Sequence, residues 1–545
     1  MNKKLLLVVV SFFFFLSLPF LCSGEQLTVL HTNDTHSHLF SFGPHNGYGG
    51  IARMSTLIKE MKEGGGNVLT LNSGDVFVGT FAFNKYLGYV ELKIMEDLYD
   101  AWCLGNHEFD LGVDTLAAIL GGDVAGGSPI SLPTLCANID LTQLEENHPL
   151  KAFVKPYMVL DVGTIKVGLI GVVTTDPYNY SEEVNAVLQD PYQAAGEAAY
   201  ALRYSKGCDV VICLSHLGKT ADEIGLSQVQ GIDIIVGGHS HDAILEPEIV
   251  NGKIIVQAGE FGKYLGELKV DIENGQVNLV KYKLHQIRKR VKKDPALVPM
   301  LKNLKYGICS DPRFGPVYTE RIATAKENLE ERWKEGSARR DTALGNLVTD
   351  AIRASVENSG LFPRGGYPLI AFEANGYIAH RIYKGKVVGN DVMRAVPYGY
   401  DPESGLGFKM KVVLLAGQQI LAGLEYSVSI AEYTDDLSMQ VSGLTFKYDS
   451  SKPPVSIEEL LEGKLSRLDP ASVKIQGDPI NPQGLYWVAL NEQLLKFLLS
   501  LNLLPFQVID TGLFEYNIVR DFMRKLEQLN YTSEGRIIDV ALKSE

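Results

Sequence analysis

Residues 104–110 read Leu-Gly-Asn-His-Glu-Phe-Asp, and the interpretation of the whole chain begins with them. This stretch places an amide, an imidazole and two carboxyl groups directly after a glycine. The three-residue spacing of His107 and Asp110 suits a turn that returns the carboxylate to the ring and fixes its tautomer. A hydrogen-bonded pair with a purely structural role is the alternative. We expect Glu108 to support or pack against this turn rather than to take part in catalysis.

Four further segments carry similar polar residues, each at the end of an apolar run. They are Asp34 and His36 after residues 27–33, Asp75 after residues 67–72, His216 after residues 210–213, and His239 and His241 after residues 232–236. Ligands in open α/β sheets lie beyond the carboxyl ends of the strands, so these side chains are expected to meet at one edge. Residues two apart on an extended backbone point the same way, so Asp34 and His36 can hold one ion. An isolated loop histidine is the alternative for any single one, but five such segments in register make coincidence improbable.

The five segments together resemble the calcineurin-like dinuclear metallophosphatases, and within them the exported 5′-nucleotidase family. The matching pieces are Asp34-x-His36, Gly74-Asp75, Gly105-Asn106-His107-Glu108, His216 and Gly238-His239-Ser240-His241. The resemblance implies that one metal ion is held by Asp34, His36, Asp75 and His241, and the other by Asp75, Asn106, His216 and His239, with Asp75 bridging. It also implies that His107 faces the substrate phosphate and that Asp110 orients it.

Two divalent metal ions are therefore the expected cofactors. Mixed aspartate, histidine and asparagine ligands suit Zn, Mn, Co or Fe, and the sequence leaves the choice open. Four positive charges against two ligand carboxylates leave a local surplus of about +2 for a water-derived nucleophile and a phosphoryl group. This local charge contrasts with the whole chain, whose 51 basic and 65 acidic residues give a net charge of -14. Such a balance argues against binding a nucleic-acid polymer.

The first 24 residues have the order of a secretory signal: two lysines, an apolar run and then small residues. An exported protein, periplasmic or extracellular, is therefore expected. Lipid anchorage through Cys22 is an alternative, although Phe20 and Leu21 are bulky for that type of signal. No later segment is apolar enough to predict a transmembrane span in the mature chain. We expect a monomer that binds a small-molecule phosphoester.

The 545 residues are too many for one hydrophobic core, and β-branched runs alternating with amphipathic stretches predict an α/β fold. The resemblance refines this fold class to an N-terminal four-layer αββα metallophosphatase sandwich over residues 25–300 and a C-terminal α/β (α+β) substrate domain of the 5′-nucleotidase type over residues 337–545. Residues 301–336 are expected to be a linker, with a bridging helix near residues 319–336.

The resemblance is weaker in the second domain. Residues 339–347 resemble the segment that opens the nucleotidase substrate domain, which implies that Arg340, with Arg339 as a helper, reaches the substrate phosphate. The family's phosphate-binding arginine is replaced here by Ala379, and the family's glycine-rich loop with its stacking aromatic residue is absent after Asn491. The sequence therefore supports the metal-site chemistry more firmly than the choice of a nucleotide.

The leading hypothesis is an exported, two-metal phosphoric monoester hydrolase that releases phosphate from nucleoside 5′-monophosphates. The alternative enzymes are two-metal hydrolases of another ester, such as a 2′,3′-cyclic nucleotide, a UDP-sugar or a sugar phosphate, and more distantly a sulfur ester. A non-catalytic extracytoplasmic binding protein is the alternative from another class. The departures in the C-terminal half motivate it, whereas the complete ligand set and the His107–Asp110 pair argue against it.

Overall fold

The computed structural model describes residues 25–176, 180–273, 275–333, 339–360, 366–431 and 436–541. The predicted signal segment and Cys22 lie outside these residues, so export and lipid attachment stay predictions. Within the described ranges, no helix is both long and apolar enough to cross a membrane.

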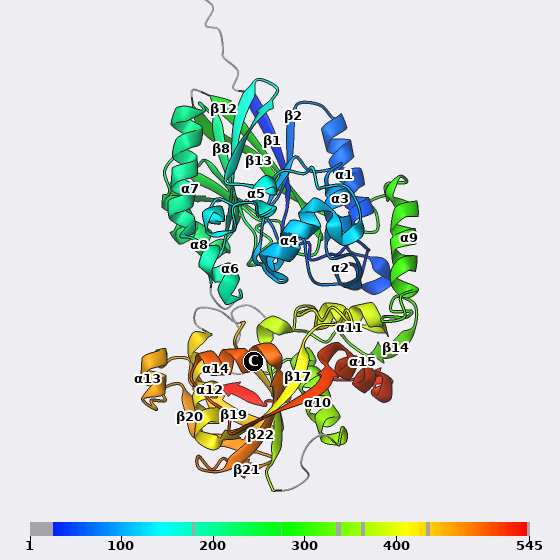
Figure 1. Ribbon diagram of the computed structural model, residues 1–545, viewed down its shortest axis with the longest axis vertical. Coiled ribbons are helices and arrows are strands. Elements are labelled where there is room, and N and C mark those ends of the chain that lie inside the picture. The colour runs from blue at the N-terminus through cyan, green and yellow to red at the C-terminus, as the bar shows by residue number, and fades with distance from the viewer. Residues whose placement is uncertain are drawn as a thin grey trace, which may run out of the picture.

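The N-terminal part of the chain (residues 25–309) contains two stacked sheets (Figure 1). The first has the order β13 (Gln276–Gln286), β12 (Tyr264–Glu273), β1 (Glu25–Thr32), β2 (Asn67–Asn72), β3 (Ala101–Cys103), β4 (Thr134–Leu135) and β5 (Val154–Lys155). The second has the order β10 (Glu248–Val250), β11 (Lys253–Val256), β9 (Ile234–Val236), β8 (Val210–His216), β7 (Ile165–Val173) and β6 (Tyr157–Val162). Strands β1 to β5 run parallel, as do β7, β8, β9 and β11. The carboxyl ends of these strands therefore share one edge of the sandwich.

Helices cover the outer face of each sheet, which gives the predicted helix–sheet–sheet–helix order. Apolar residues of β1, β2, β7, β8 and β9 fill the space between the two sheets. On the first sheet lie α1 (Ile51–Glu63), α3 (Tyr89–Met95) and α4 (Gly112–Gly121), which bury Ile58, Leu92 and Leu116. On the second lies α7 (Pro191–Tyr200), which buries Ala195 and Ala199 against the outward side chains of β7 and β8. The predicted four-layer fold class is confirmed.

The C-terminal part (residues 310–541) is a smaller α/β unit. Its central sheet has the order β18 (Met439–Ser442), β15 (Leu369–Ala374), β22 (Leu485–Asn491), β17 (Lys409–Ala416) and β23 (Gln507–Phe514). One face packs against α10 (Ala343–Asn358) and α15 (Glu515–Leu526), and the other against α12 (Gly417–Ile430) and α14 (Glu492–Ser500). Two smaller sheets complete the unit: β16 (Gly385–Val388), β14 (Arg321–Ala325) and β24 (Gln528–Leu529), and β21 (Asp478–Pro479), β20 (Leu468–Ile475), β19 (Leu444–Tyr448) and β25 (Ile537–Asp539).

The prediction of a bridging helix near residues 319–336 is wrong for residues 319–333, the part of that range that the structure describes. The helix that ends the N-terminal part is α9 (Leu297–Cys309), which follows the basic run of residues 288–293. Leu297, Leu301, Leu304 and Ile308 recur at helical spacing and pack on the N-terminal part. Residues 321–325 instead form β14, which pairs with β16 and β24. The C-terminal unit therefore starts before residue 337, because β14 belongs to one of its sheets.

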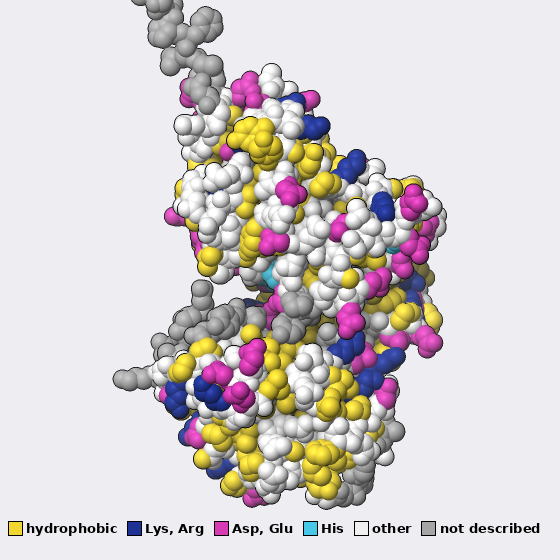
Figure 2. Space-filling view, turned by 60° about the vertical axis from the view of Figure 1, so that its left-hand side comes forward, with side chains coloured by type: hydrophobic (Ala, Val, Ile, Leu, Met, Phe, Trp, Pro, Cys, Tyr) yellow, Lys and Arg dark blue, Asp and Glu magenta, His cyan; other side chains and the backbone are white. Residues whose placement is uncertain are grey.

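The two parts meet along a seam at the carboxyl edge of the N-terminal sheets. The seam contains ring contacts such as that of Phe81, in α2 (Phe81–Tyr86), with Tyr516 of α15, whose ring centroids lie 5.1 Å apart. The side-chain amide of Asn84 donates a hydrogen bond of 2.9 Å to the carbonyl oxygen of Gly405. Figure 2 shows a hollow between the two parts on one face, with histidine atoms visible at its edge.

Candidate metal centre

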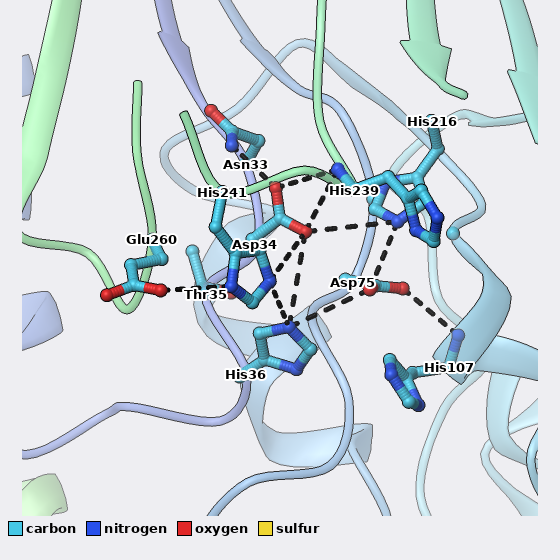
Figure 3. Close-up of polar contacts among 12 residues, drawn as sticks. Asn33, Asp34, Thr35, His36, Asp75, His107, His216, His239, His241 and Glu260 are labelled. Carbon is cyan, nitrogen blue, oxygen red and sulfur yellow. Dashed lines mark hydrogen bonds and ion pairs between the residues drawn. The ribbon is translucent and has the colours of Figure 1, made fainter. Parts of the chain in front are cut away.

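Six of the seven predicted ligands form two groups at the seam. Asp34, His36 and His241 form the first group, and Asp75, His216 and His239 form the second. Within each group one ligand atom of every residue lies within 4.8 Å of the others. Asp75 Oδ2 lies 3.0 Å from His216 Nε2 and 3.7 Å from His36 Nε2, so Asp75 stands between the two groups (Figure 3). The seventh predicted ligand, Asn106, joins the second group, since its Oδ1 is 2.9 Å from His239 Nδ1.

The ligand-bearing loops are fastened to one another by backbone hydrogen bonds. In the loop after β1, the backbone amides of Asp34 and His36 donate hydrogen bonds of 3.0 Å. The acceptors are the carbonyl oxygens of Gly74 and Asp75 in the loop after β2. A Cβ on Gly74 would come within 2.7 Å of the Gly105 amide nitrogen, so only glycine fits at this crossing. The ligands with positive φ are Asp34, His36, Asp75, His239 and His241. Residues other than glycine rarely adopt this backbone conformation. Several such residues close together are typical of a functional site.

The far ring nitrogens of three histidines are held by acceptors, which turns the near nitrogens toward the ligand groups. Nδ1 of His216 donates to the Ser73 carbonyl over 2.6 Å, and Nδ1 of His36 donates to that of Phe77 over 3.2 Å. Nδ1 of His241 lies 2.9 Å from the Glu260 carboxylate. The Nε2 atoms of His36 and His241 then face each other at 3.1 Å, while His216 Nε2 points at the Asp75 carboxylate over 3.0 Å. Ring nitrogens and carboxylate oxygens gathered this closely are a donor set that divalent metal ions bind, so these residues fit metal ions.

The centre contains ionised carboxylates despite its burial. Burial alone would raise the pKa of Asp75, but His216 and His107 hold it well below its usual range. Burial opposes a charge on His216 as well, yet Asp75 and Asp34 raise its pKa to about 9. Two ionised aspartates inside the protein therefore need positive charge beside them, which protonated histidines supply in the metal-free protein and divalent ions would supply when bound.

His107 and Asp110 form the predicted pair beside the second group. Nδ1 of His107 lies 2.9 Å from Asp110 Oδ2, and the His107 amide donates to Asp75 Oδ1 over 3.0 Å. Burial opposes protonation, but Asp110 and Asp75 raise the pKa of His107 to about 10. Tyr398 of the C-terminal part stacks on the His107 ring with centroids 5.1 Å apart. The C-terminal part thus covers this imidazole directly.

Glu108 anchors the Asp75 loop, in agreement with the supporting role expected for it. Its Oε2 accepts from the amides of Gly105 and Asp75 over 2.6 and 3.0 Å. Its Oε1 accepts from the amides of Val76 and Phe77 over 2.8 and 3.0 Å. Four backbone donors on one buried carboxylate hold the loop after β2 against the turn that carries His107.

Sequence reasoning missed the residues that support the ligands from distant segments. Asn33 donates to Asp34 Oδ2 over 2.6 Å, and Glu260 fixes the His241 ring. The ring of Phe261 lies 5.7 and 5.6 Å from those of His36 and His241. Asn33 could have been found because it adjoins the motif, but nothing in the sequence links Glu260 or Phe261 to the site.

The two predicted substrate arginines lie in the C-terminal unit, outside both ligand groups. Arg340 is exposed and Arg339 half-buried, and both line a hollow that also includes Trp333. The structure does not place them in either ligand group, so their substrate role stays a prediction. A third arginine, Arg332, donates to the carbonyl oxygens of residues 375 and 378, in the segment that ends at Ala379.

The chain matches two family models in sequence. Residues 27–243 match the calcineurin-like phosphoesterase model, and residues 321–496 match the C-terminal domain model of 5′-nucleotidases. The second match begins at β14, in keeping with the earlier start of the C-terminal unit.

The chain is also similar to proteins of this architecture along almost its whole length. It is 29% identical over 560 residues to the trifunctional nucleotide phosphoesterase protein YfkN of Bacillus subtilis. The matched region covers 95% of this chain but only 35% of that longer protein. It is 26% identical to the 5′-nucleotidase of Diplobatis ommata over 94% of this chain and 90% of that protein. The solved structure of a 5′-nucleotidase precursor from Thermus thermophilus is 30% identical, covers 94% of this chain and 99% of its own, and superposes with a TM-score of 0.80.

Proposed function

The chain belongs to the 5′-nucleotidase family of calcineurin-like phosphoesterases, and from this premise we propose that it hydrolyses nucleoside 5′-monophosphates to nucleosides and phosphate. Membership makes it a metal-dependent phosphoesterase that acts on nucleotides. The observation that carries the proposal is the joint position of the two ligand groups and the His107–Asp110 pair under the C-terminal part.

Two divalent ions are proposed at the two groups. Asp34, His36, Asp75 and His241 would hold one ion, and Asp75, Asn106, His216 and His239 the other. When bound, such ions activate a water molecule as a nucleophile and neutralise charge on phosphoryl oxygens. Aspartate, histidine and asparagine ligands suit Zn, Mn, Co and Fe, and we leave the identity to metal analysis.

His107 is the proposed catalytic group of the chain itself. Its Nδ1 is engaged by Asp110, so Nε2 is the atom free to donate a hydrogen bond to a phosphoryl oxygen. The Asp75 carboxylate holds the His107 backbone amide, which fixes the ring beside the second ligand group. Charge that develops on the phosphoryl group would then meet a fixed donor, the usual means of stabilising such a transition state.

The C-terminal part is proposed to bind the rest of the nucleotide. Tyr398 and Tyr377 have ring centroids 6.1 Å apart, and Tyr377 and Phe408 have centroids 5.2 Å apart, so aromatic faces line the seam beside His107. Such faces can stack on a base. Arg340 and Arg339 are retained as proposed phosphate-binding residues, which requires the C-terminal part to present them to the seam in a different orientation.

Export to the periplasm or the cell exterior is proposed from the signal-like residues 1–24, and a monomeric state is proposed with it. Fractionation of cells that express the tagged chain tests the first of these, and light scattering of the purified protein tests the second.

The function is tested with metal-free protein reloaded with each candidate ion. Chromatography of the products measures turnover of AMP, a 2′,3′-cyclic nucleotide, a UDP-sugar, a sugar phosphate and a sulfur ester, because only the monoesters AMP and sugar phosphate release inorganic phosphate directly. The proposal predicts that a nucleoside monophosphate gives the highest kcat/KM and that His107→Ala abolishes most of the turnover. Hydrolysis of sugar phosphates without any nucleotide would overturn the substrate assignment. Tight nucleotide binding without hydrolysis would favour the binding protein instead.

A further inference from the structure

A buried arginine of the C-terminal part crosses the seam to reach the metal-binding loop of the N-terminal part. Arg394 lies in α11 (Gly389–Ala395), and only 2% of its surface is exposed. Its Nη1 donates to Asp391 Oδ1 over 3.0 Å, and its Nη2 contacts the ring of His380. Its Nε donates over 3.2 Å to Nε2 of His38, which belongs to the loop after β1. The guanidinium also lies over the Phe42 ring, 4.3 Å from its centroid.

The hydrogen bonds of His38 connect this arginine to the backbone of a proposed ligand. Arg394 can only donate, so Nε2 of His38 accepts and Nδ1 carries the proton. Nδ1 lies 2.8 Å from the carbonyl oxygen of His36 and 3.1 Å from that of Thr35, and it donates to them. His36 has a φ of 44°, a conformation that persists only where the surroundings hold it. His38 supplies one of those restraints.

A second contact joins the same cluster to the ligands. The ring of Phe261 lies 4.4 Å from that of His38 and 4.9 Å from that of His380. The same Phe261 ring also contacts the proposed ligands, with centroid distances of 5.7 Å to His36 and 5.6 Å to His241. The amide of Phe261 donates to the Asp34 carbonyl over 2.7 Å. Side chains from the C-terminal part therefore complete the outer wall of the first ligand group.

We propose that Arg394 is a positioning residue for the first metal site: it holds His38, and through it the His36 backbone, so that metal affinity depends on the C-terminal part being seated on the seam. The proposal rests on the metal centre of the proposed function, but not on its substrate. Residues behind the ligands of a metal site typically contribute 10- to 100-fold in affinity. By linkage, a bound ion in turn favours the seated position of the C-terminal part.

The competing explanation is that Arg394 only stabilises the seam. A control separates the two, because Arg381 is also an arginine of the C-terminal part that pairs with carboxylates. It pairs with Glu330 over 2.7 Å and with Glu331 over 3.3 Å, both within its own part. Arg381→Met should therefore lower stability without changing the metal site.

The experiment titrates the metal-free full chain with Co²⁺ alone and follows its visible absorption, which reports both affinity and ligand geometry. The variants are Arg394→Met, His38→Asn, the double variant and the control Arg381→Met. His38→Asn keeps a donor near Nδ1 but removes the acceptor for Arg394. We expect Arg394→Met and His38→Asn each to weaken one of two Co²⁺ sites about 10-fold and to change its spectrum. The double variant should lose no more than the worse single variant, because both act through one contact.

Unchanged Co²⁺ affinity and spectrum in folded Arg394→Met and His38→Asn would overturn the proposal, as would an equal loss in Arg381→Met. A wild-type chain that binds no Co²⁺ would overturn it as well. Phosphate release is measured separately, so a chain that binds Co²⁺ in an Arg394-dependent way but hydrolyses no nucleotide refutes the proposed substrate and leaves the positioning role standing.

Discussion

Replacement of Glu108 by glutamine tests whether a buried carboxylate holds the Asp75 loop in place. Each carboxylate oxygen accepts two backbone N–H groups, but a glutamine offers only one oxygen and turns an NH₂ group toward the other two donors. Leaving one buried donor without an acceptor costs about 1–3 kcal/mol. The two donors left without an acceptor therefore predict a decrease of about 2–6 kcal/mol in the free energy of unfolding.

Glu91→Gln is the matched control. Glu91 is 3% exposed, but one of its oxygens accepts from the Ser37 hydroxyl and the other has no hydrogen-bond partner. A glutamine at position 91 can still accept from the Ser37 hydroxyl, so the expected change is at most about 1 kcal/mol.

Urea unfolding of the metal-free proteins, with metal content after reloading as a second measurement, compares the two substitutions. Glu108→Gln should be clearly less stable than Glu91→Gln and should retain less metal, because the loop that carries Asp75 is released. Equal stability and equal metal content in the two variants would refute the anchoring role of Glu108.

Three further predictions concern single side chains. His107→Ala should lower kcat about 10²–10⁴-fold while both ions stay bound; loss of metal in parallel with activity would make His107 structural. Asp75→Asn should reduce the bound metal, measured by elemental analysis, far more than His107→Ala does, and equal retention would argue against a bridging ligand. Burial raises the pKa of Glu515, beside Glu373, from about 4.5 to about 7, so the unfolded chain ionises first and stability falls between these pH values. Glu515→Gln should remove this loss of stability, which is worth up to about 3 kcal/mol. Thermal unfolding of both proteins at pH 5 and pH 8 measures it, and an unchanged pH dependence in the variant would contradict the prediction.

The sequence was sufficient to predict the N-terminal fold and the ligands because both depend on local patterns. Each ligand stands at the end of an apolar strand, and parallel strands bring their carboxyl ends together whatever the lengths of the connections. Asp34, Asp75 and His216 could therefore be placed at one edge without knowledge of any tertiary contact.

The residues around the ligands could not be predicted, because their contacts depend on how distant segments pack. Phe261 and Arg394 touch the same loop from positions that no short motif connects to it. The bridging helix was misplaced for a related reason: the basic residues near Leu297 masked a helical apolar spacing, and residues 321–325 become a strand only through pairing with β16 and β24. Propensity is overridden in such cases by tertiary contacts.

The central claim is that the chain holds two metal ions that share Asp75. Anomalous diffraction from crystals of the whole chain grown with Mn²⁺ tests it directly. The account predicts two anomalous peaks flanking the Asp75 carboxylate, one beside His36 and His241 and the other beside His216 and His239. A single peak, or peaks that leave Asp75 without contact, would contradict it.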